Sequence, residues 1–410
     1  MKRKVLIHSL IFSPDGVSTA YLYNDIALKF KEQGYNVKVL TTTPHYNVVP
    51  EQLQEQPLKW KIWGICKKSN FRGIEVLHIP QKKFKSTALR LVGFIYWHVI
   101  SFILGLCQRN VDLIISPSPP LTIGVINVWL AKIKGCKVVY NVQEIYPDIL
   151  KNKNKTLISA LKKIERYVYN SSSAVTTIDK IFYNTIVDRF KDKDKLHIIP
   201  NFVDTNLYNP NSGNIEDLDN KLFPKTNSIK LLYAGNIGYA QDWEPLVKLA
   251  QKTQNLQIEY FIIGEGVMKS WLEGQVQKLN LNRVHVIPYQ PRSLMPSILA
   301  YSDLQFIFMN PKMDRDGFPS KVYTIMACGK PLLVYSGKNT PIVNFLRDIG
   351  CAKIVSNDNL EDRIEEMYQW LSSISKDNLV KMGNNGESVI SKYYTKDIVT
   401  EQYVDLANHL

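Results

Sequence analysis

One stretch of the chain, Asp314-Arg-Asp-Gly-Phe-Pro-Ser-Lys-Val-Tyr-Thr-Ile-Met-Ala-Cys-Gly-Lys-Pro-Leu-Leu-Val-Tyr335, reads as a loop, a short helix and a strand. The loop supplies carboxylates and exposed amides, and Lys321 stands where the apolar helix starts. Gly329 is placed to end that helix. The run 331–335 that follows is apolar, as expected of a strand buried on both faces of a parallel sheet.

Similar apolar runs recur on both sides of this stretch, separated by longer segments with a helical pattern. This alternation is typical of parallel sheets that are covered by helices on both faces. The expected strands in the first half are 4–8, 37–41, 74–78, 113–116, 137–140, 174–177 and 197–200. Those in the second half are 230–234, 258–263, 284–287, 304–308, 331–335 and 352–355. We predict an α/β protein with two doubly wound, Rossmann-like domains that face each other across a cleft.

The length of 410 residues agrees with two domains. A polar, turn-rich segment, 209–228, is the predicted linker between an N-terminal domain at 1–208 and a C-terminal domain at 229–390. The last segment, 391–410, is expected to form a helix that packs back on the N-terminal domain. Five scattered cysteines without a C-x-x-C pair favour neither a disulfide framework nor a zinc site, so we expect a reducing cytoplasm.

The net charge of +14 favours an anionic partner: nucleic acid, anionic lipid or a phosphorylated substrate. Segment 58–109 concentrates this charge, with ten basic residues against the single acid Glu75. Within it, 91–107 is apolar and fits a core helix, a helix lying at a membrane interface or a span, and all three remain open. We predict peripheral binding to the inner face of an anionic membrane, and no nucleic-acid partner because no nucleic-acid-binding motif is found.

Two glycine-bearing turns join a strand to a helix, one at the start of each predicted domain. The first surrounds Gly16, and the second contains Asn236, Gly238 and Gln241. Amide groups at such a turn can hold a diphosphate. A plain tight turn is the alternative, since a single glycine is not a G-x-G-x-x-G fingerprint.

The stretch 314–331 resembles the donor-site segment of glycosyltransferase family 4, whose members typically read E-G-F-G-x-P-x-x-E-A-M-A-C-G-x-P-V. The matching residues are Gly317-Phe318, Pro319 and Met326-Ala-Cys-Gly-Lys-Pro331. The likeness extends over the whole chain, through segments 14–16, 199–204, 234–238 and 261–266. Segment 140–148 is similar to one in members that build bacterial surface polysaccharides. The resemblance implies the GT-B fold.

The resemblance also implies a reaction: transfer of a hexose or N-acetylamino sugar from a nucleotide diphosphate sugar, with UDP as the expected nucleotide. The expected acceptor is a lipid-linked glycan or polysaccharide precursor. Retention of anomeric configuration is implied, with the departing phosphate accepting the acceptor proton. The protein would then act by positioning and electrostatics. We expect no cofactor and no built-in metal, because no histidine cluster accompanies the acidic residues.

Three positions depart from the family pattern. The two glutamates of the motif fall on Asp316 and Thr324, so that only the first keeps a carboxylate. The arginine and lysine that usually hold the donor diphosphate fall on the neutral residues Asn236 and Gln241. Lys321 is the predicted replacement cation, with Arg315 in reserve.

The resemblance also implies which residues bind the donor and which face the acceptor. Asp316, with the Gly317 and Phe318 backbone, would hold the donor sugar, and Thr324 the ribose. Glu144 and Asp148 would face the acceptor hydroxyl. The predicted donor-binding set also includes Gly16, Gly238, Ser320, Glu265, Pro288 and Tyr289, the last three near the base.

Each assignment has a structural alternative. Lys321 could be a solvated lysine at a helix start, Asp316 a turn residue and Asp148 a helix cap. His8 and His45 are more simply buried, hydrogen-bonded histidines than catalysts. The alternative functions are a GT-B sugar-nucleotide 2-epimerase, which would use Glu144 and Asp148 as acid and base, and a non-catalytic nucleic-acid binder.

Overall fold

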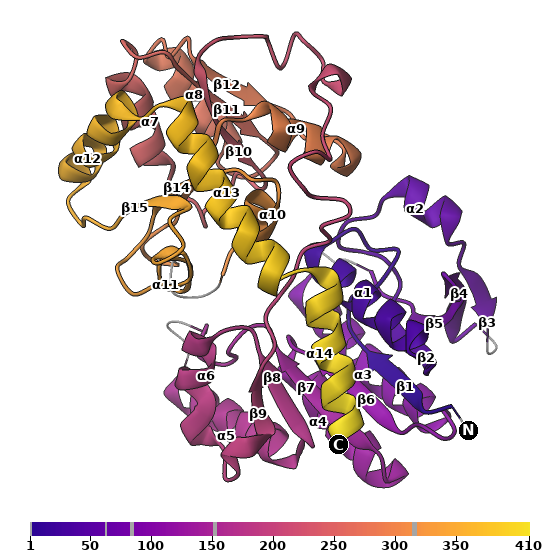
Figure 1. Ribbon diagram of the computed structural model, residues 1–410. Coiled ribbons are helices and arrows are strands. Elements are labelled where there is room, and N and C mark those ends of the chain that lie inside the picture. The colour runs from indigo at the N-terminus through magenta and orange to yellow at the C-terminus, as the bar shows by residue number, and fades with distance from the viewer. Residues whose placement is uncertain (1, 62–63, 83–85, 151–153, 314–317) are drawn as a thin grey trace. The chain divides into compact units, whose positions relative to one another are not determined.

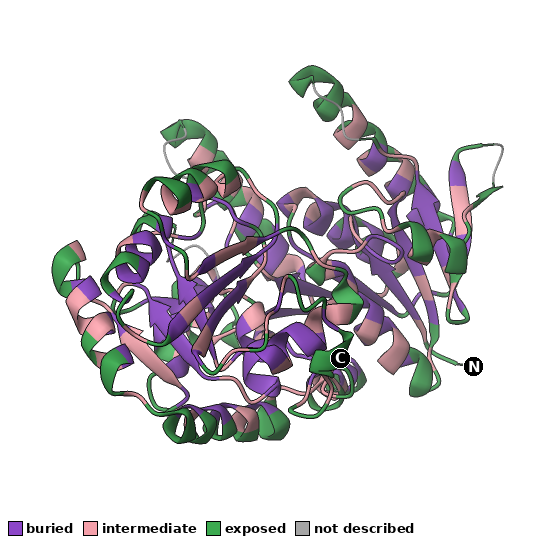
Figure 2. Ribbon diagram, turned by 90° about the horizontal axis from the view of Figure 1, so that it is seen from above, coloured by how far each residue is buried: buried purple, intermediate pink, exposed green. Residues whose placement is uncertain are grey.

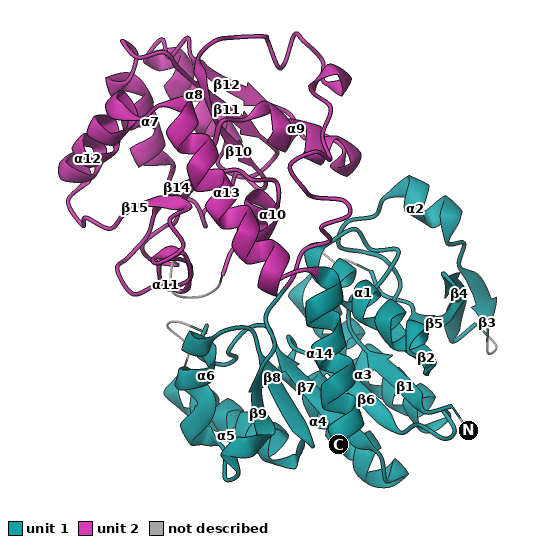
Figure 3. Ribbon diagram, in the orientation of Figure 1, with its two compact units in different colours: residues 1–201, 396–410 teal, residues 202–395 magenta. Residues whose placement is uncertain are grey.

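The computed structural model of the protein describes residues 2–61, 64–82, 86–150, 154–313 and 318–410. The chain divides into two compact units (Figure 3). The first unit comprises residues 1–201 with 396–410, and the second comprises residues 202–395. The segment 209–228, predicted as a linker, belongs to the second unit.

The first unit contains a nine-stranded sheet in the order β3-β4-β5-β2-β1-β6-β7-β8-β9 (Figure 1). The pairs β3–β4 and β4–β5 are antiparallel, and the other neighbours are parallel. Its strands are β1 (Lys4–His8), β2 (Asn36–Thr42), β3 (Lys59–Lys61), β4 (Cys66–Phe71), β5 (Ile74–Ile79), β6 (Leu113–Pro117), β7 (Lys137–Val142), β8 (Ala174–Thr177) and β9 (Leu196–Ile198).

Helices cover both faces of this sheet. The helices are α1 (Ser18–Glu32), α2 (Pro50–Glu55), α3 (Thr87–Leu106), α4 (Leu121–Lys134), α5 (Lys155–Ser171), α6 (Lys180–Ile186) and α14 (Lys396–His409). The C-terminal helix α14 packs along α1, and an ion pair between Lys29 and Glu401 at 2.6 Å joins the two. Residues from the two ends of the chain thus build one unit.

The second unit has a parallel six-stranded sheet in the order β12-β11-β10-β13-β14-β15. Its strands are β10 (Ile229–Ala234), β11 (Ile258–Ile263), β12 (Val284–Ile287), β13 (Leu304–Phe308), β14 (Leu332–Tyr335) and β15 (Ala352–Val355). Its helices are α7 (Trp243–Lys252), α8 (Lys269–Lys278), α9 (Met295–Tyr301), α10 (Lys321–Ala327), α11 (Pro341–Leu346), α12 (Leu360–Ser373) and α13 (Lys376–Tyr393).

Successive residues of the central strands alternate between two hydrophobic cores in the second unit. Phe306 and Phe308 of β13 belong to one core, and Ile307 between them belongs to the other. This double burial explains why the strands read as continuous apolar runs in the sequence. The predicted α/β class with two parallel-sheet domains is confirmed.

Each sheet has one point at which the strand order reverses. In the first, the chain builds outward from β1 through β2 and then returns to add β6 on the other side. In the second, β11 and β12 lie on one side of β10, and β13 and the later strands lie on the other. Open α/β sheets bind ligands at the carboxyl ends of the strands at such reversals. Ligand binding is therefore expected at the loops after β1 and β6 and at those after β10 and β13.

Two features of the first unit differ from the sequence-based expectation. The strands β3 and β4 form an antiparallel extension of the sheet that was not predicted, because Lys-rich edge strands lack an apolar run. The core-helix alternative for 91–107 holds for one side of the helix only: Trp97 and Leu104 belong to the core of the first unit, and most of the other residues are exposed or half-buried. Helix α3 has only 22% of its most apolar window buried, and most of it is coloured as exposed or intermediate in Figure 2. By length and composition, this is the one described helix that could cross a membrane.

Candidate functional site

Lys321 is the first residue of α10, and its side chain reaches back to the end of β10. Its Nζ donates a hydrogen bond to the carbonyl oxygen of Ala234 at 3.0 Å and lies 3.7 Å from the centroid of the Tyr233 ring. Burial lowers the pKa of Lys321 to about 7, and no carboxylate of the described residues offsets that effect. The solvated-lysine alternative is therefore wrong.

This ammonium group lies at the point where the strand order of the second sheet reverses. Ala234 ends β10, and α10 follows β13, the strand that pairs with β10 on its other side. A buried cation without a counter-ion is unfavourable unless an anion joins it, because the charged form has lost its hydration. The arrangement is thus suited to receive an anionic ligand at the carboxyl end of the sheet.

Glycines allow the loops after β10 and β11 to pass close to Lys321 and to each other. Gly235 has a φ of 150°, and a Cβ there would come within 2.6 Å of the Lys321 Nζ. Gly264, with a φ of 145°, has no room for a Cβ, which would overlap the carbonyl oxygen of Gly235. The loops after β10 and β11 are joined by hydrogen bonds, from Gly235 N to Ile263 O at 2.9 Å and from Ile237 N to Glu265 O at 2.8 Å.

Asn236 and Gln241, the neutral residues at the family's cationic positions, differ in their surroundings. Asn236 is exposed. Gln241 is buried, and its strand-like bridge to Met309 ties the loop after β10 to the end of β13. Its Oε1 is buried without a hydrogen-bond partner among the described residues. Gly238, also buried, accepts a hydrogen bond at its carbonyl from Trp243 Nε1 at 3.0 Å.

The residues predicted to lie near the base do come together. Glu265 follows β11, and Pro288 and Tyr289 follow β12, the next strand of the sheet. The amide of Tyr289 lies 3.4 Å from Glu265 Oε1, and Lys269 Nζ donates to the same oxygen at 2.7 Å. Because Lys269 stabilises its ionised form, the pKa of Glu265 is lowered. The exposed Tyr289 ring offers a flat apolar surface beside a carboxylate.

The donor-motif residues fall into three groups. Arg315, Asp316 and Gly317 lie outside the described residues. The Phe318 ring packs against Tyr323 and Phe345, so its side chain has a structural role and only its backbone is left for a ligand. Ser320 is exposed, and Thr324 is half-buried in α10, one helical turn after Lys321.

In the first unit, the turn after β1 is held by a carboxylate that the sequence reasoning left unassigned. Asp15 is buried and accepts hydrogen bonds from the amides of His45, Tyr46 and Asn47 at 3.0, 3.0 and 2.7 Å. The amide of Gly16 donates to the carbonyl of Asn47 at 2.8 Å. Gly16 therefore has no amide to offer a diphosphate, and its predicted contact through that group is not supported.

Glu144 lies in the loop after β7, supported by a buried polar network. Asn141 donates to Thr176 Oγ1 at 2.8 Å and to Tyr403 OH at 2.9 Å, and Gln143 donates to Asn141 Oδ1 at 2.8 Å. Partial burial raises the pKa of the Glu144 carboxyl. No ion pair to Glu144 occurs within the described part of the chain.

Asp148, in contrast, is already paired. Arg189 contacts both Asp148 and the buried Glu165, and Lys162 Nζ lies 3.3 Å from Asp148 Oδ1. Because these two cations already hold the carboxylate, it is less free to accept a hydrogen bond from an acceptor hydroxyl. Asp148 does not cap α5, because Asn154 occupies that position and accepts from the Thr156 amide at 2.9 Å.

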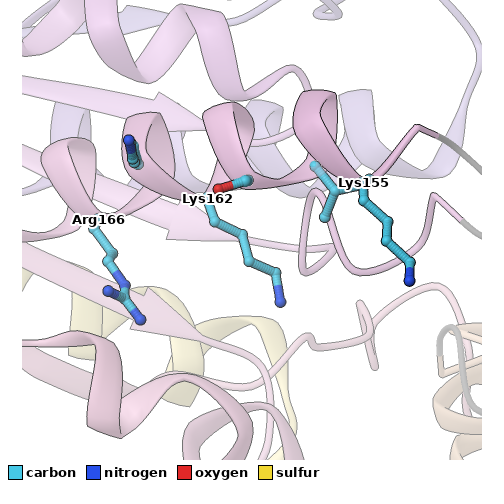
Figure 4. A pocket seen from close by; sticks show the side chains of 6 residues that line it. Lys155, Lys162 and Arg166 are labelled. Atoms are coloured by element: carbon cyan, nitrogen blue, oxygen red, sulfur yellow. The ribbon is translucent and has the colours of Figure 1, made fainter.

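Helix α5 carries a basic face beside this cluster. A surface hollow of about 410 Å³ is lined by Lys155, Lys162 and Arg166, whose side chains project from one side of the helix (Figure 4). The residues are spaced as neighbours on a helical face. This second basic surface lies outside the segment 58–109 and was not predicted.

His8 follows the structural alternative, whereas His45 is half-buried. His8 is fully buried, its Nδ1 lies 2.6 Å from Asn127 Oδ1, and burial lowers its pKa to about 4. Nδ1 of His45 lies 2.8 Å from the carbonyl oxygen of Thr43. The fully buried His8 ring is not placed as a general base for an acceptor. Among the described residues, no three His, Cys, Asp or Glu side chains form a group that could hold a metal ion.

Comparison with known proteins agrees with this arrangement. The family model described as Glycosyltransferase Family 4 matches residues 20–207, and the one described as Glycosyl transferases group 1 matches residues 214–389. The chain is 23% identical to WcaI of Escherichia coli strain K12, named as a glycosyl transferase of colanic acid biosynthesis, over 90% of this chain and 92% of that protein. It is 21% identical to WbjE of Pseudomonas aeruginosa, named as a glycosyltransferase, over 72% of this chain and 74% of that protein.

Solved structures agree on the fold. The chain matches HepE of Anabaena in complex with UDP with a TM-score of 0.71 and 14% identity, over the whole of both chains. It matches WaaG, a glycosyltransferase involved in lipopolysaccharide biosynthesis, with a TM-score of 0.66 and 14% identity, over 98% of this chain and 99% of that one. These matches show the GT-B fold. The two family models together span most of the chain, which is a glycosyltransferase belonging to family 4.

Proposed function

We propose that the protein transfers a hexose or N-acetylamino sugar from a UDP-sugar to a lipid-linked or polysaccharide-precursor acceptor, with retention of anomeric configuration. The observation that carries this proposal is Lys321, a desolvated amine at the strand reversal of the second sheet to which the described residues offer no counter-ion. A diphosphate would supply the missing charge. The complex of HepE with UDP supports UDP as the nucleotide, and the names of WcaI and WaaG support an acceptor in surface-polysaccharide assembly.

In this reaction the sugar–phosphate bond breaks and negative charge accumulates on the leaving diphosphate. Lys321 stabilises that charge from a fixed position, which needs no reorganisation during the reaction. The half-buried Thr324 offers a hydroxyl to the ribose, and the exposed Tyr289 ring offers a surface to the base. On the acceptor side, Glu144 accepts a hydrogen bond from the acceptor hydroxyl and orients it.

The proposal replaces both alternative functions. Family membership makes glycosyl transfer the activity, so the epimerase and the nucleic-acid binder are not retained. Metal independence remains a prediction. Asp314 and Asp316 have a D-x-D spacing, a pattern that could hold a divalent ion, and both lie outside the described residues. Activity that survives EDTA would support it.

We also propose that the protein works in the cytoplasm, on the inner face of the membrane. Support comes from α3, whose exposed apolar residues include Leu91, Val92, Ile95, Val99 and Ile103. Lys59, Lys61 and Trp60 lie exposed on the edge strand β3. Basic and aromatic residues around an apolar helix face are what an interfacial protein presents to anionic lipid.

The proposed reaction is tested by incubating the purified protein with UDP-, GDP-, ADP- and dTDP-linked sugars without an acceptor. We expect slow hydrolysis of a UDP-sugar, with release of UDP and a sugar whose first-formed anomer matches that of the donor. Release from no donor, or conversion to an isomeric sugar nucleotide, would contradict the proposal.

A further inference from the structure

We propose that a hollow in the first unit binds the aliphatic chain and the adjoining phosphate of the lipid-linked acceptor. This inference rests on the proposed function, because it takes the acceptor to be lipid-linked. The hollow has a volume of about 900 Å³. Its wall combines apolar side chains from α2, β3 and α3, among them Leu53, Leu58, Leu89 and Val92.

The strands β3 and β4 direct one set of side chains into this hollow. Leu58 and Trp60 are two residues apart and line it, and Lys67, which pairs with Trp60 across the hairpin, lines it as well. Alternation along a strand places these residues on one face. Lys68, on the opposite face, is paired with Glu75. The strand extension that the sequence did not predict thus forms a wall of the hollow.

The hollow carries positive charge at its polar end. Lys67 and Lys82 both line it. Lys67 Nζ lies 4.8 Å from the centroid of the Trp60 ring, and neither lysine has a carboxylate partner within the described part of the chain. Apolar walls with two free ammonium groups complement a chain that ends in a phosphate. A neutral lipid would leave these charges unused.

The hollow lies between α3, the helix proposed to contact the membrane, and the carboxyl ends of the strands, where open α/β sheets bind ligands. Thr43 and Pro44 directly follow β2, and Pro80 to Lys82 directly follow β5, so the hollow opens at the carboxyl ends of these strands. The Gln81 amide donates to Thr43 Oγ1 at 2.9 Å, which fixes the two loops to each other. On its other side the hollow is bounded by Leu89, Val92 and Tyr96 of α3, the helix proposed to lie on the bilayer.

A bilayer would need only the apolar face of α3, not a recess behind it. The recess, with lysines at the sheet edge, fits a single lipid molecule whose chain leaves the bilayer and whose phosphate points to the strand ends. A glycan beyond that phosphate would then extend along the edge that also carries Asp15 and Glu144. For this reason we assign the hollow to the acceptor lipid and not to bulk phospholipid.

The test uses the full chain and a soluble probe, dodecyl phosphate, below its micellar concentration, with binding followed by calorimetry and by the fluorescence of Trp60. Two variants of α3 are compared: Leu89→Gln with Val92→Gln, which changes the hollow, and Val99→Gln with Ile103→Gln, which changes the same exposed helix outside it. Both lose similar apolar surface at exposed positions, so both should fold.

We expect the first variant to bind dodecyl phosphate roughly tenfold more weakly or worse, and the second to stay within about twofold of the wild type. The double variant Lys67→Glu with Lys82→Glu should weaken the binding of dodecyl phosphate by a similar factor and leave the binding of dodecanol unchanged. A blue shift of tryptophan emission should accompany binding and disappear in Trp60→Phe.

Equal losses in the two α3 variants, or equal affinity for dodecanol and dodecyl phosphate, would overturn the proposal. So would tighter binding of dihexanoyl phosphatidylglycerol than of dodecyl phosphate, which would assign the hollow to bulk lipid. If a second copy of the chain occupies the hollow instead, sedimentation should show a dimer for the wild type, and the first variant should abolish that dimer. The binding assay needs no turnover, so failure here leaves the donor-hydrolysis result standing, and failure of donor hydrolysis leaves this one standing.

Discussion

At the scale of single residues, the account depends most on Lys321. Its ammonium is held by one carbonyl oxygen and one aromatic ring, and it is the candidate to replace the two cations that Asn236 and Gln241 lack. The Gly235 backbone beside it leaves space that any side chain would occupy. These contacts explain how a lysine can be kept in place although the described residues give it no counter-ion.

Lys321→Ala should lower kcat/KM for the donor by roughly 100-fold or more, the usual effect of removing one electrostatic stabiliser of a leaving group. Steady-state assays of UDP release would measure it. The matched control is Lys278→Ala, an exposed lysine at the end of α8, which should leave the rate unchanged. A loss below about fivefold in folded Lys321→Ala would reject the assignment.

The folding stability should also depend on Lys321 through pH. The pKa of its ammonium is about 7 in the folded protein against about 10.4 in an unfolded chain, so between these values the unfolded state binds more protons. This residue therefore contributes a destabilisation at neutral pH that is relieved as pH rises from 7 toward 10. In urea unfolding, wild type should gain stability relative to Lys321→Met over this range. A constant difference between the two proteins would show that the ammonium is not desolvated.

The sequence predicted this residue but not its surroundings. Two neutral side chains at positions where the family has cations indicated that Lys321 replaces them, whereas its contacts with Tyr233 and Ala234 arise from tertiary packing. Asp15 and Asn141 were missed for the same reason, since a buried polar side chain looks like any other in the sequence. The exposure of α3 could not be predicted either, because a core helix and a surface helix of this composition read alike.

At the scale of elements, the loops after β10 and β11 form the base of the donor site. Their close approach depends on Gly264, where a side chain would strike the carbonyl of Gly235. The apolar runs predicted the strands on both sides of these loops to within two residues. They gave no sign of β3 and β4, because an antiparallel edge strand can be solvated on one side and needs no continuous apolar run.

Gly264→Ala should lower the free energy of unfolding by about 2 kcal/mol or more, through backbone strain and the clash with Gly235, and should weaken donor binding. Gly274→Ala is the control. Gly274 lies inside α8, and nothing lies within 4 Å of a Cβ there, so alanine should stabilise the protein by up to about 1 kcal/mol. Thermal unfolding of the two variants with and without UDP measures both effects. Equal stability would mean that the two loops can separate without cost.

At the scale of the whole molecule, the positive charge is distributed unevenly. Of the ten basic residues in 58–109, Lys83 and Lys85 lie outside the described residues, and Lys68 is paired with Glu75. Of the others, Lys59 and Lys61 lie on β3, Lys67 lies on β4, Lys82 follows β5 and Arg90 lies on α3. If this surface faces the bilayer, the salt dependence of membrane binding should come from it and not from the net charge of the chain.

Changing Lys59, Lys67 and Lys82 to Glu should release the protein from anionic vesicles at low salt, since each lysine near such a surface contributes about 1 kcal/mol. Changing Lys278, Lys376 and Lys381 of the second unit to Glu alters the net charge equally and should leave binding nearly intact. Vesicle sedimentation at low and high salt compares the two. Equal release of both variants would indicate an effect of net charge alone. Binding that does not change with salt concentration would contradict the electrostatic model.

The central claim, that Lys321 is the cation that receives the donor diphosphate, is tested most directly by counting protons. A UDP-sugar is titrated into the protein at pH 8 by calorimetry in two buffers of different ionisation enthalpy. Because Lys321 is largely neutral at this pH before binding and should be charged beside a diphosphate, the wild type should take up between about half a proton and one proton per donor bound. The Lys321→Arg variant should take up none. Equal proton uptake by the two proteins, or none by the wild type, would contradict the account.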